Sequence, residues 1–358
     1  MKIEKGIPVS PAIHRRGLLL GALGLAAAPL LAACADDEPA AAPGASGAAG
    51  PKQLRIGYQL IPNGDLIVKD QGWLEAALPG TKVVWSKFDS GGDVNTAIIA
   101  GAIDIGLAGS SPVARGLAAP LNIPYAVPWI FDVIGDNEAL VVKPGIDSVA
   151  ALAGKKVATP FASTSHYSLL AALAAAGVPE SGLKIIDLEP PEIQAAWQRG
   201  DIDGAYVWTP VLAELRKQGK VLVTSRDLAG QGKLTADLAV VRKDFLAQYP
   251  AAVKTWLRQQ DRAVKLTRSD KAAAAASIGK QLNLSPDEAA AQLAELVLLD
   301  LSEQAGADYL GKPGAPGKLA ENLHSAAEFL TAQKKLTGAP DLAVYQSALA
   351  VQALADAA

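Results

Sequence analysis

Residues 54–107 read LRIGYQLIPNGDLIVKDQGWLEAALPGTKVVWSKFDSGGDVNTAIIAGAIDIGL, and the order of apolar segments in this stretch indicates the fold class. Three short apolar segments have the pattern of buried strands, at 54–59, 81–85 and 103–107. Helical patterns lie between them at 65–78 and 94–100. Strands and helices that alternate at this spacing predict a parallel sheet with helices on both faces.

A second strand and helix series begins after Glu138. It predicts a helix at 169–176 and strands at 139–143, 157–158, 184–188 and 205–208. After about Leu238 the pattern is almost wholly helical. We therefore predict an α/β chain in which residues 53–137 and 239–358 form lobe 1 and residues 138–238 form lobe 2. Ligands of open α/β sheets bind beyond the carboxyl ends of the strands, so a ligand cleft is expected between the lobes.

The N-terminal segment has the order of an export signal. An apolar stretch over 17–30 follows four basic residues, which are Lys2, Lys5, Arg15 and Arg16. Residues 31–34 read LAAC, which resembles the bacterial lipobox; the alternative is a plain cleavable signal with a chance cysteine. We expect a signal peptide at 1–33, a lipid on Cys34, and a flexible tether over 34–52. Twin-arginine export and the general secretory route both remain open.

Composition excludes several function classes. The chain has 358 residues, a net charge of −3 and one cysteine. The charge offers no basic surface to nucleic acid, and one cysteine allows neither an internal disulfide nor a cysteine-rich metal site. The histidines are scattered, and neither glycine-rich nucleotide motif is present. We expect no metal, no cofactor and no nucleic-acid partner.

Two hydroxyl-rich segments stand where helices are expected to begin. Residues 109–112 read GSSP, with Ser111 as a natural N-cap and Pro112 as the first helical residue. Residues 163–168 read STSHYS, where Thr164 can cap a helix. Helix N-termini attract anions. The two segments therefore indicate one anion held between both lobes, although each could be an ordinary helix cap.

Three further residues indicate a site for a cation. Trp208 ends an expected strand, where its ring face could meet an ammonium group or simply lie in the core. Asp237 is an isolated acid entering an apolar strand, and Glu138 stands just before another. A buried charge is costly unless it is paired. Each acid is therefore expected to bind either a ligand ammonium or a structural Lys or Arg.

Six segments resemble the sulfonate-, nitrate- and thiamine-precursor-binding proteins of ABC importers. They are WSKFDSG (85–91), GSSP (109–112), NEALVVK (137–143), PFASTSHYSLLAAL (160–173), PPEIQAAWQRGDIDGAYVW (190–208) and VRKDF (241–245). The resemblance implies a two-lobed, type II periplasmic-binding fold. The fourth and fifth segments look specific to the taurine branch of the family.

The resemblance also implies roles for individual residues. Sulfonate contacts fall on Gln59, Ser110, Ser111, Thr164 and His166. Trp208 becomes the aromatic wall, Asp237 the acid that binds the amine, and Glu138 a hinge residue. Relatives carry an aromatic residue two positions after that acid, where this chain has Ala239, so a wider pocket is expected.

Together these observations predict a monomeric extracytoplasmic solute-binding protein without catalysis. It would be anchored to the membrane by its lipid and would deliver taurine or a related sulfonate to an importer permease and its ATPase. The alternatives are other alkanesulfonates or nitrate as ligands, or an enzyme like the thiamine-pyrimidine synthases. Those enzymes use a reactive His and a Cys-rich motif, and the body of this chain has no cysteine. A receptor sensor domain is a third possibility.

Overall fold

The computed structural model describes residues 50–358. The expected signal peptide, Cys34 and residues 34–49 of the expected tether lie outside the described residues. The end of the expected tether packs on the fold: the Pro51 carbonyl accepts a hydrogen bond from Thr81 Oγ1 at 2.8 Å, and the Lys52 carbonyl accepts one from Lys82 N at 3.0 Å.

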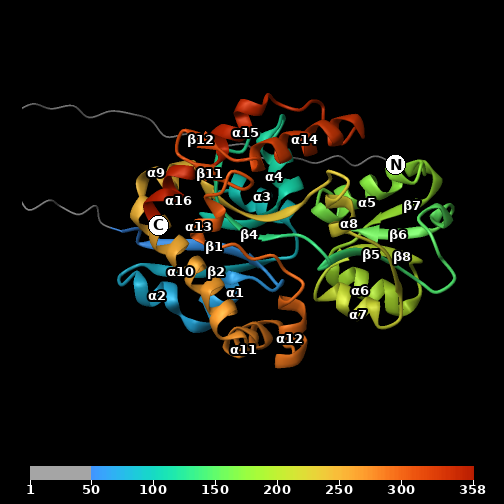
Figure 1. Cartoon of the computed structure of the whole chain (residues 1–358), viewed down its shortest axis with the longest axis horizontal. Helices are drawn as coiled ribbons and strands as arrows, with labels where there is room; N and C mark the ends of the chain where they lie inside the picture. The colour runs from blue at the N-terminus through green and yellow to red at the C-terminus, as the bar shows by residue number, and fades with distance from the viewer. Residues whose placement is uncertain (1–49) are drawn as a thin grey trace, which may run out of the picture. The chain divides into compact units, whose positions relative to one another are not determined.

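The first of two five-stranded sheets has the order β2-β1-β3-β10-β4. Its strands are β1 (Gln53–Gln59), β2 (Lys82–Phe88), β3 (Ile105–Gly109), β4 (Tyr125–Val133) and β10 (Ala236–Arg242). The first three run parallel, whereas β10 is antiparallel to both of its neighbours. Figure 1 shows this sheet in the lobe that also holds both ends of the described chain.

The second sheet has the order β7-β6-β8-β5-β9. Its strands are β5 (Glu138–Val142), β6 (Lys156–Thr159), β7 (Lys184–Asp187), β8 (Gly204–Trp208) and β9 (Lys220–Thr224). Here β5 is antiparallel to both of its neighbours. The chain enters this lobe through residues 134–137 and leaves it through residues 230–235.

Helices cover both sheets. Those of the first lobe and the chain that follows it are α1 (Gly64–Gln71), α2 (Trp73–Ala77), α3 (Gly91–Ile99), α4 (Ser110–Leu117), α9 (Lys243–Gln248), α10 (Pro250–Ser269), α11 (Lys271–Leu282), α12 (Pro286–Leu293), α13 (Leu301–Gln304), α14 (Leu319–Ala332), α15 (Leu342–Ala348) and α16 (Val351–Ala357). Those of the second lobe are α5 (Thr164–Ala175), α6 (Pro190–Arg199), α7 (Val211–Arg216) and α8 (Ser225–Ala229). No described helix has the length and hydrophobicity of a membrane span.

The α/β fold class and the two lobes are as predicted, but the expected parallel sheet was wrong, because each sheet is mixed. Strands β4 and β9 were not predicted. The predicted lobe boundary after residue 238 falls inside β10, which pairs with the first sheet from Ala236 to Arg242. Beyond it, the chain is helical apart from the short hairpin of β11 (Gly311–Lys312) and β12 (Ala315–Pro316).

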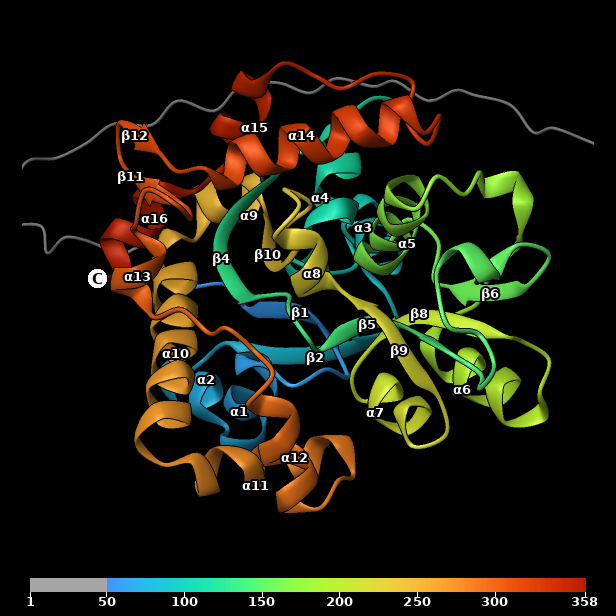
Figure 2. The ribbon, with the colours of Figure 1, turned by 45° about the vertical axis from the view of Figure 1, so that its right-hand side comes forward.

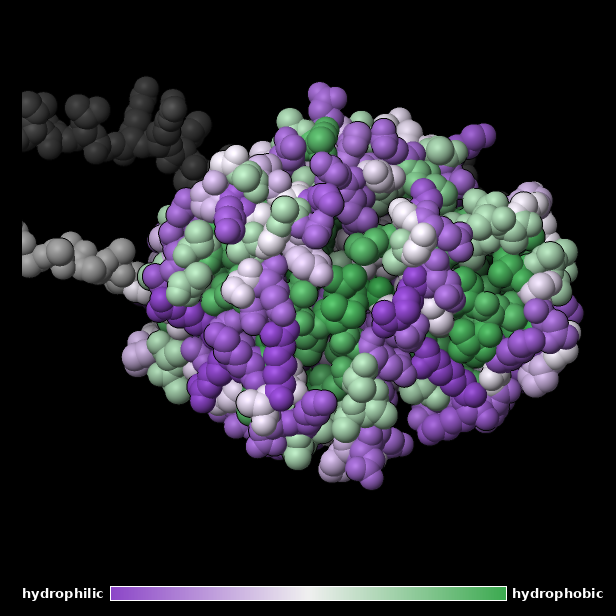
Figure 3. All heavy atoms as spheres, viewed as in Figure 1, coloured by the Kyte–Doolittle hydropathy of each residue, from purple (hydrophilic) through white to green (hydrophobic). Residues whose placement is uncertain are grey.

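Apolar side chains form one large core in the first lobe and two smaller cores in the second. The two smaller cores lie on opposite faces of the second sheet, one beneath α6 and α7 and one beneath α5 and α8. Figure 3 shows hydrophobic residues gathered in two areas of one face, with hydrophilic residues between them.

Helix α14, in the C-terminal part of the chain, contacts both lobes. It packs on α4 of the first lobe (Figure 2), while its Phe329 ring contacts Tyr167 of α5 with ring centroids 5.1 Å apart. Lys335, just beyond α14, forms an ion pair of 2.7 Å with Glu180 of the second lobe. The helical C-terminal part therefore contributes to the contact between the lobes.

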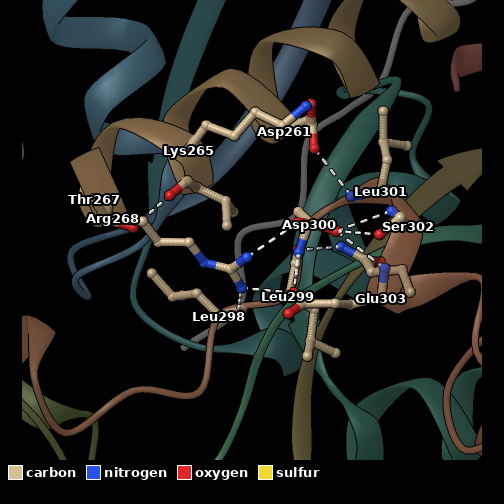
Figure 4. Close-up of polar contacts among 12 residues, drawn as sticks. Asp261, Lys265, Thr267, Arg268, Leu298, Leu299, Asp300, Leu301, Ser302 and Glu303 are labelled. Carbon is tan, nitrogen blue, oxygen red and sulfur yellow. Dashed lines mark hydrogen bonds and ion pairs between the residues drawn. The ribbon is translucent and has the colours of Figure 1, made fainter.

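A polar cluster fixes α13 to α10 (Figure 4). Asp300 caps α13 by accepting hydrogen bonds from the backbone N–H groups of Ser302 and Glu303, and it also accepts one from Arg268 at 3.0 Å. Asp261 of α10 accepts a hydrogen bond of 2.9 Å from the Leu301 N–H. This anchoring holds α13 beside β4.

Candidate functional site

A small cavity of about 20 Å³ lies where the two lobes meet. Both lobes contribute to its walls, which are formed by Gln59, Ile61, Gly91, Gly109, Pro112, Ile134, Asn137, Glu138, Ser163, Thr164, Trp208 and Asp237.

The cavity brings together residues that are far apart in the sequence. Five of the predicted ligand-binding residues line it: Gln59, Glu138, Thr164, Trp208 and Asp237. The other three, Ser110, Ser111 and His166, are buried beside lining residues but do not line the cavity themselves.

Two helix N-termini meet at one side of the cavity. Gly109 precedes α4 and Ser163 precedes α5, and both line the wall. The predicted caps were wrong at both helices. Gly109 rather than Ser111 is the N-cap of α4, and Ser163 rather than Thr164 caps α5, with its Oγ accepting a hydrogen bond from the His166 N–H. Free backbone N–H groups at these ends favour an anion.

Ser110 and Ser111 have different surroundings. Ser110 Oγ accepts a hydrogen bond of 3.2 Å from the Ala236 N–H and so ties α4 to the start of β10. Ser111 Oγ is buried without a hydrogen-bond partner among the described residues. A buried hydroxyl without a partner is costly, so this donor is free for a ligand group or a water molecule.

Glu138, the first residue of β5, is almost completely buried and accepts hydrogen bonds from three hydroxyls. The donors are Thr164 Oγ1 at 2.6 Å, Ser225 Oγ at 2.8 Å and Ser168 Oγ at 3.4 Å. Burial raises the pKa of Glu138, and these hydrogen bonds oppose the rise. The Thr164 hydroxyl therefore binds a carboxyl group of the same lobe.

Asp237 stands on the cavity wall directly opposite Asp132 in the register of β10 and β4. No ion pair among the described residues includes either acid, so the structural Lys or Arg considered from the sequence is not seen there. Burial raises the pKa of Asp237 well above its ordinary value, and the nearby carboxyls of Asp132 and Glu138 raise it further. Glu138 and Asp237 thus line the cavity, and Asp132 lies opposite Asp237 in the strand register.

His166 lies behind the cavity wall. Its ring stacks on Phe161 with centroids 4.6 Å apart, and its Nδ1 accepts a hydrogen bond of 3.2 Å from the Ala162 N–H. Burial lowers the pKa of His166 to about 4, and the charge of Lys335 acts in the same direction. The ring is therefore neutral near pH 7. Nε2 has no hydrogen-bond partner among the described residues.

The remaining predicted residues have simple environments. Gln59 is buried at the end of β1, and its Nε2 donates a hydrogen bond of 3.0 Å to the Leu107 carbonyl. Trp208 ends β8 and is half-buried on the cavity wall. Ala239 is fully buried opposite Trp129 of β4 and is not a lining residue, so it does not widen the cavity as expected.

Several residues of the site were not predicted. Asn137, Gly91, Ile61 and Ile134 line the cavity, and Asp132 lies behind Asp237. The sequence could have indicated Asp132, because this acid is the second-last residue of the apolar segment YAVPWIFDV, much as Asp237 lies near the start of its own strand. Among the described residues, no group of His, Cys, Asp or Glu is arranged to hold a metal ion.

Comparison with known proteins gives a family for the chain. A family model described as the substrate-binding domain of the ABC-type glycine betaine transport system matches residues 52–295. The taurine-binding periplasmic protein of Escherichia coli (strain K12) is 44% identical over 207 residues. That match covers 53% of this chain and 64% of the relative, so it spans somewhat less than two thirds of the relative's length.

Solved structures share the fold. The alkanesulfonate-binding protein SsuA from Xanthomonas axonopodis pv. citri, bound to MOPS, has a TM-score of 0.70 at 23% identity, covering 84% of this chain and 99% of that one. The periplasmic aliphatic sulphonate-binding protein SsuA from Escherichia coli has a TM-score of 0.65 at 24% identity, covering 83% and 92%.

Proposed function

The chain belongs to this family of ABC-transporter substrate-binding domains, and from that membership we propose that it captures taurine or a related sulfonate for an ABC importer. It acts outside the cytoplasm as a monomer, anchored by a lipid on Cys34 after removal of residues 1–33. Its partners are the importer permease and its ATPase. It binds its ligand without changing it.

The observation that carries this proposal is the polarity of the cavity. The N-termini of α4 and α5 lie at its wall and favour an anion. Asp237 lies next to them, opposite Gly109 in the register of β10 and β3, and it receives no hydrogen bond from a described N–H or O–H group. Glu138 also lines the cavity, and Asp132 lies opposite Asp237 in the register of β10 and β4. An anion site beside an acidic site suits a small zwitterion with a sulfonate at one end and an ammonium at the other.

Trp208 supports a ligand with a positive end. Trp208 also lines the cavity, and an aromatic face attracts an ammonium group by about 0.5–2 kcal/mol. Residues of both lobes line the cavity, so a small ligand bound there would contact both lobes.

Nitrate and simple alkanesulfonates are less well matched. Either could lie at the helix N-termini, but neither would compensate the buried acids, and an uncompensated buried charge is costly. The enzyme alternative calls for the reactive His and Cys-rich motif of the thiamine-pyrimidine synthases, and neither Cys nor His is among the lining residues. The relative with 44% identity is a taurine-binding protein, which favours the same ligand.

Calorimetric titration of the purified chain tests the proposal. We expect taurine to bind more tightly than ethanesulfonate, and ethanesulfonate more tightly than nitrate. Mass spectrometry of the same mixtures should recover taurine unchanged. Absence of taurine binding, or tighter binding of nitrate, would contradict the proposed ligand, and any product would contradict the assignment as a binding protein.

A further inference from the structure

Asp132 is a buried acid to which the proposed function gives no role of its own. It lies near the end of β4 with 1% of its surface exposed. Its Oδ2 accepts a hydrogen bond of 3.3 Å from Asn137 Nδ2. Its Oδ1 has no N–H or O–H donor among the described residues. One oxygen of a fully buried carboxyl is thus left to interact with the carboxyl of Asp237.

An irregularity in β4 places the two acids opposite each other. Leu238 pairs with Ile130 and Asp237 pairs with Asp132, so β4 has one extra residue between these pairs. Directly opposite residues of an antiparallel pair share a face, with Cβ atoms about 4.5–5.5 Å apart. Gln304 of α13 stabilises the irregularity, because its side chain bonds both the N–H and the carbonyl of Ile130, at 2.8 and 3.1 Å.

No positive charge compensates this pair among residues 50–358. The groups around it are the carboxyl of Glu138, the amide of Asn137, and hydroxyls of α5 and α8 that bind Glu138. Basic side chains of the adjoining helices bind other acids, in the ion pairs Arg226–Asp136 and Arg216–Glu295, both 2.8 Å. Two ionised carboxylates opposite each other would repel strongly.

One proton between the two acids resolves this repulsion. Burial raises the pKa of Asp132 to about 7, and hydrogen bonds from Asp237 and Asn137 oppose that rise. The pKa of Asp237 is raised further, by burial and then by the charges of Asp132 and Glu138. The pair therefore holds a proton near neutral pH, with the O–H of Asp237 donating to Asp132.

We propose that Asp132 completes the ammonium site as a second, specificity-determining carboxyl, and that it shares one proton with Asp237 until an ammonium ligand displaces that proton. The O–H bond of the acid pair breaks and its proton passes to solvent. The ligand ammonium keeps its own protons and takes over the compensation of charge. This inference rests on the proposed function, and it further implies that a sulfonate without an amine binds while the acid pair keeps its proton.

Calorimetry of the purified chain in two buffers of different ionisation enthalpy measures the proton count. At pH 7 we expect release of about one proton per taurine and about none per ethanesulfonate. Taurine affinity should fall by up to about tenfold per pH unit as the pair becomes protonated, whereas ethanesulfonate affinity should hold or rise. Taurine binding without proton release would overturn this inference and leave the proposed function intact. Absence of taurine binding would overturn both.

Asp132→Asn distinguishes the contribution of Asp132 to proton release from that of the other acids. An amide can donate to Asp237 and keep it ionised, so taurine should still bind while proton release falls to near zero. Asp147→Asn, on an exposed acid, is the matched control and should release the same proton as the unaltered chain. Unchanged release in Asp132→Asn would refute the role of Asp132. If that variant does not fold, infrared difference spectra of the unaltered chain should show loss of a protonated carboxyl band with taurine, and its persistence would refute the inference.

Discussion

Gly109 and Thr164 belong to different lobes, yet a Cβ atom on Gly109 would lie 2.5 Å from Thr164 Cγ2. The first residue precedes α4 and the second begins α5, so their contact joins the two helix N-termini that line the cavity. Gly109 has φ −65°, a value open to any residue. Its lack of a side chain is therefore required by the neighbouring lobe rather than by its own backbone.

Gly109→Ala should weaken ligand binding and leave each lobe folded. The added methyl group would clash with Thr164, and the clash could be relieved only by moving the lobes apart. Overpacking of this kind costs about 1–3 kcal/mol. Taurine affinity should fall roughly tenfold or more. Small-angle scattering should show compaction by taurine in the unaltered chain and less compaction in the variant.

Gly106→Ala provides the contrast for this experiment. Gly106 lies in the same strand, but a Cβ there would be 2.6 Å from Val94 Cγ1 of the same lobe. That clash cannot be relieved by opening the cleft, so this variant should lose thermal stability without ligand. If Gly109→Ala shows the same loss of stability with normal compaction, the contact between the lobes does not limit closure.

Sequence patterns predicted much of the fold because strand and helix periodicity is a local property. They failed where the structure depends on which strands pair and in which direction. The antiparallel direction of β10 beside β3 depends on the path of the chain through the other lobe, which no local pattern encodes. Strand β4 was missed although it is apolar, and with it Asp132.

The candidate site was predicted unevenly for the same reason. Residue type and position at strand ends indicated Trp208 and Asp237, and the family resemblance indicated Gln59; all three line the cavity. Individual hydrogen bonds could not be predicted. The Thr164 hydroxyl does not cap its helix. It donates a hydrogen bond of 2.6 Å to the carboxyl of Glu138, which comes from a strand distant in the sequence. Such contacts depend on distances that only the folded chain defines.

His166 should make the fold sensitive to acid. Its pKa is lowered by burial from 6.5 to about 4, so the folded chain favours the neutral ring. Between these pH values the unfolded chain binds the proton more readily, and the free energy of unfolding falls as the pH drops from 6.5 to 4. The loss is at most about 3 kcal/mol. His166→Gln should flatten the pH dependence of the melting temperature in this window. An unchanged slope would show that other groups cause the acid sensitivity.

Cys34→Ser tests the anchor. Cys34 is the only cysteine of the chain and closes the LAAC sequence, so its thiol is the expected site of lipid attachment. Cell fractionation should move the protein from the membrane fraction to the soluble extracytoplasmic fraction. Ala35→Ser, one residue later, should stay with the membrane. Membrane retention of Cys34→Ser would contradict the anchor.

Asp237→Asn tests recognition of the amine. A desolvated carboxylate contributes about 1.5–3 kcal/mol through a charged hydrogen bond to an ammonium group, more than the aromatic face of Trp208 alone. The variant should bind taurine roughly ten- to a hundred-fold more weakly, as measured by calorimetric titration. Ethanesulfonate has no ammonium to lose, so its affinity should hold or improve. Both ligands share the sulfonate, which makes each the internal control for the other.

The same variant distinguishes a ligand role from a structural one. Asp237 has no Lys or Arg partner among the described residues, so replacing it with a neutral amide breaks no ion pair, and the amide can donate a hydrogen bond to Asp132 as the protonated acid does. The melting temperature without ligand should therefore hold or rise. A fall in melting temperature together with equal losses for taurine and ethanesulfonate would mean that Asp237 supports the fold. A stable variant with a loss confined to taurine requires that the carboxylate itself binds the amine.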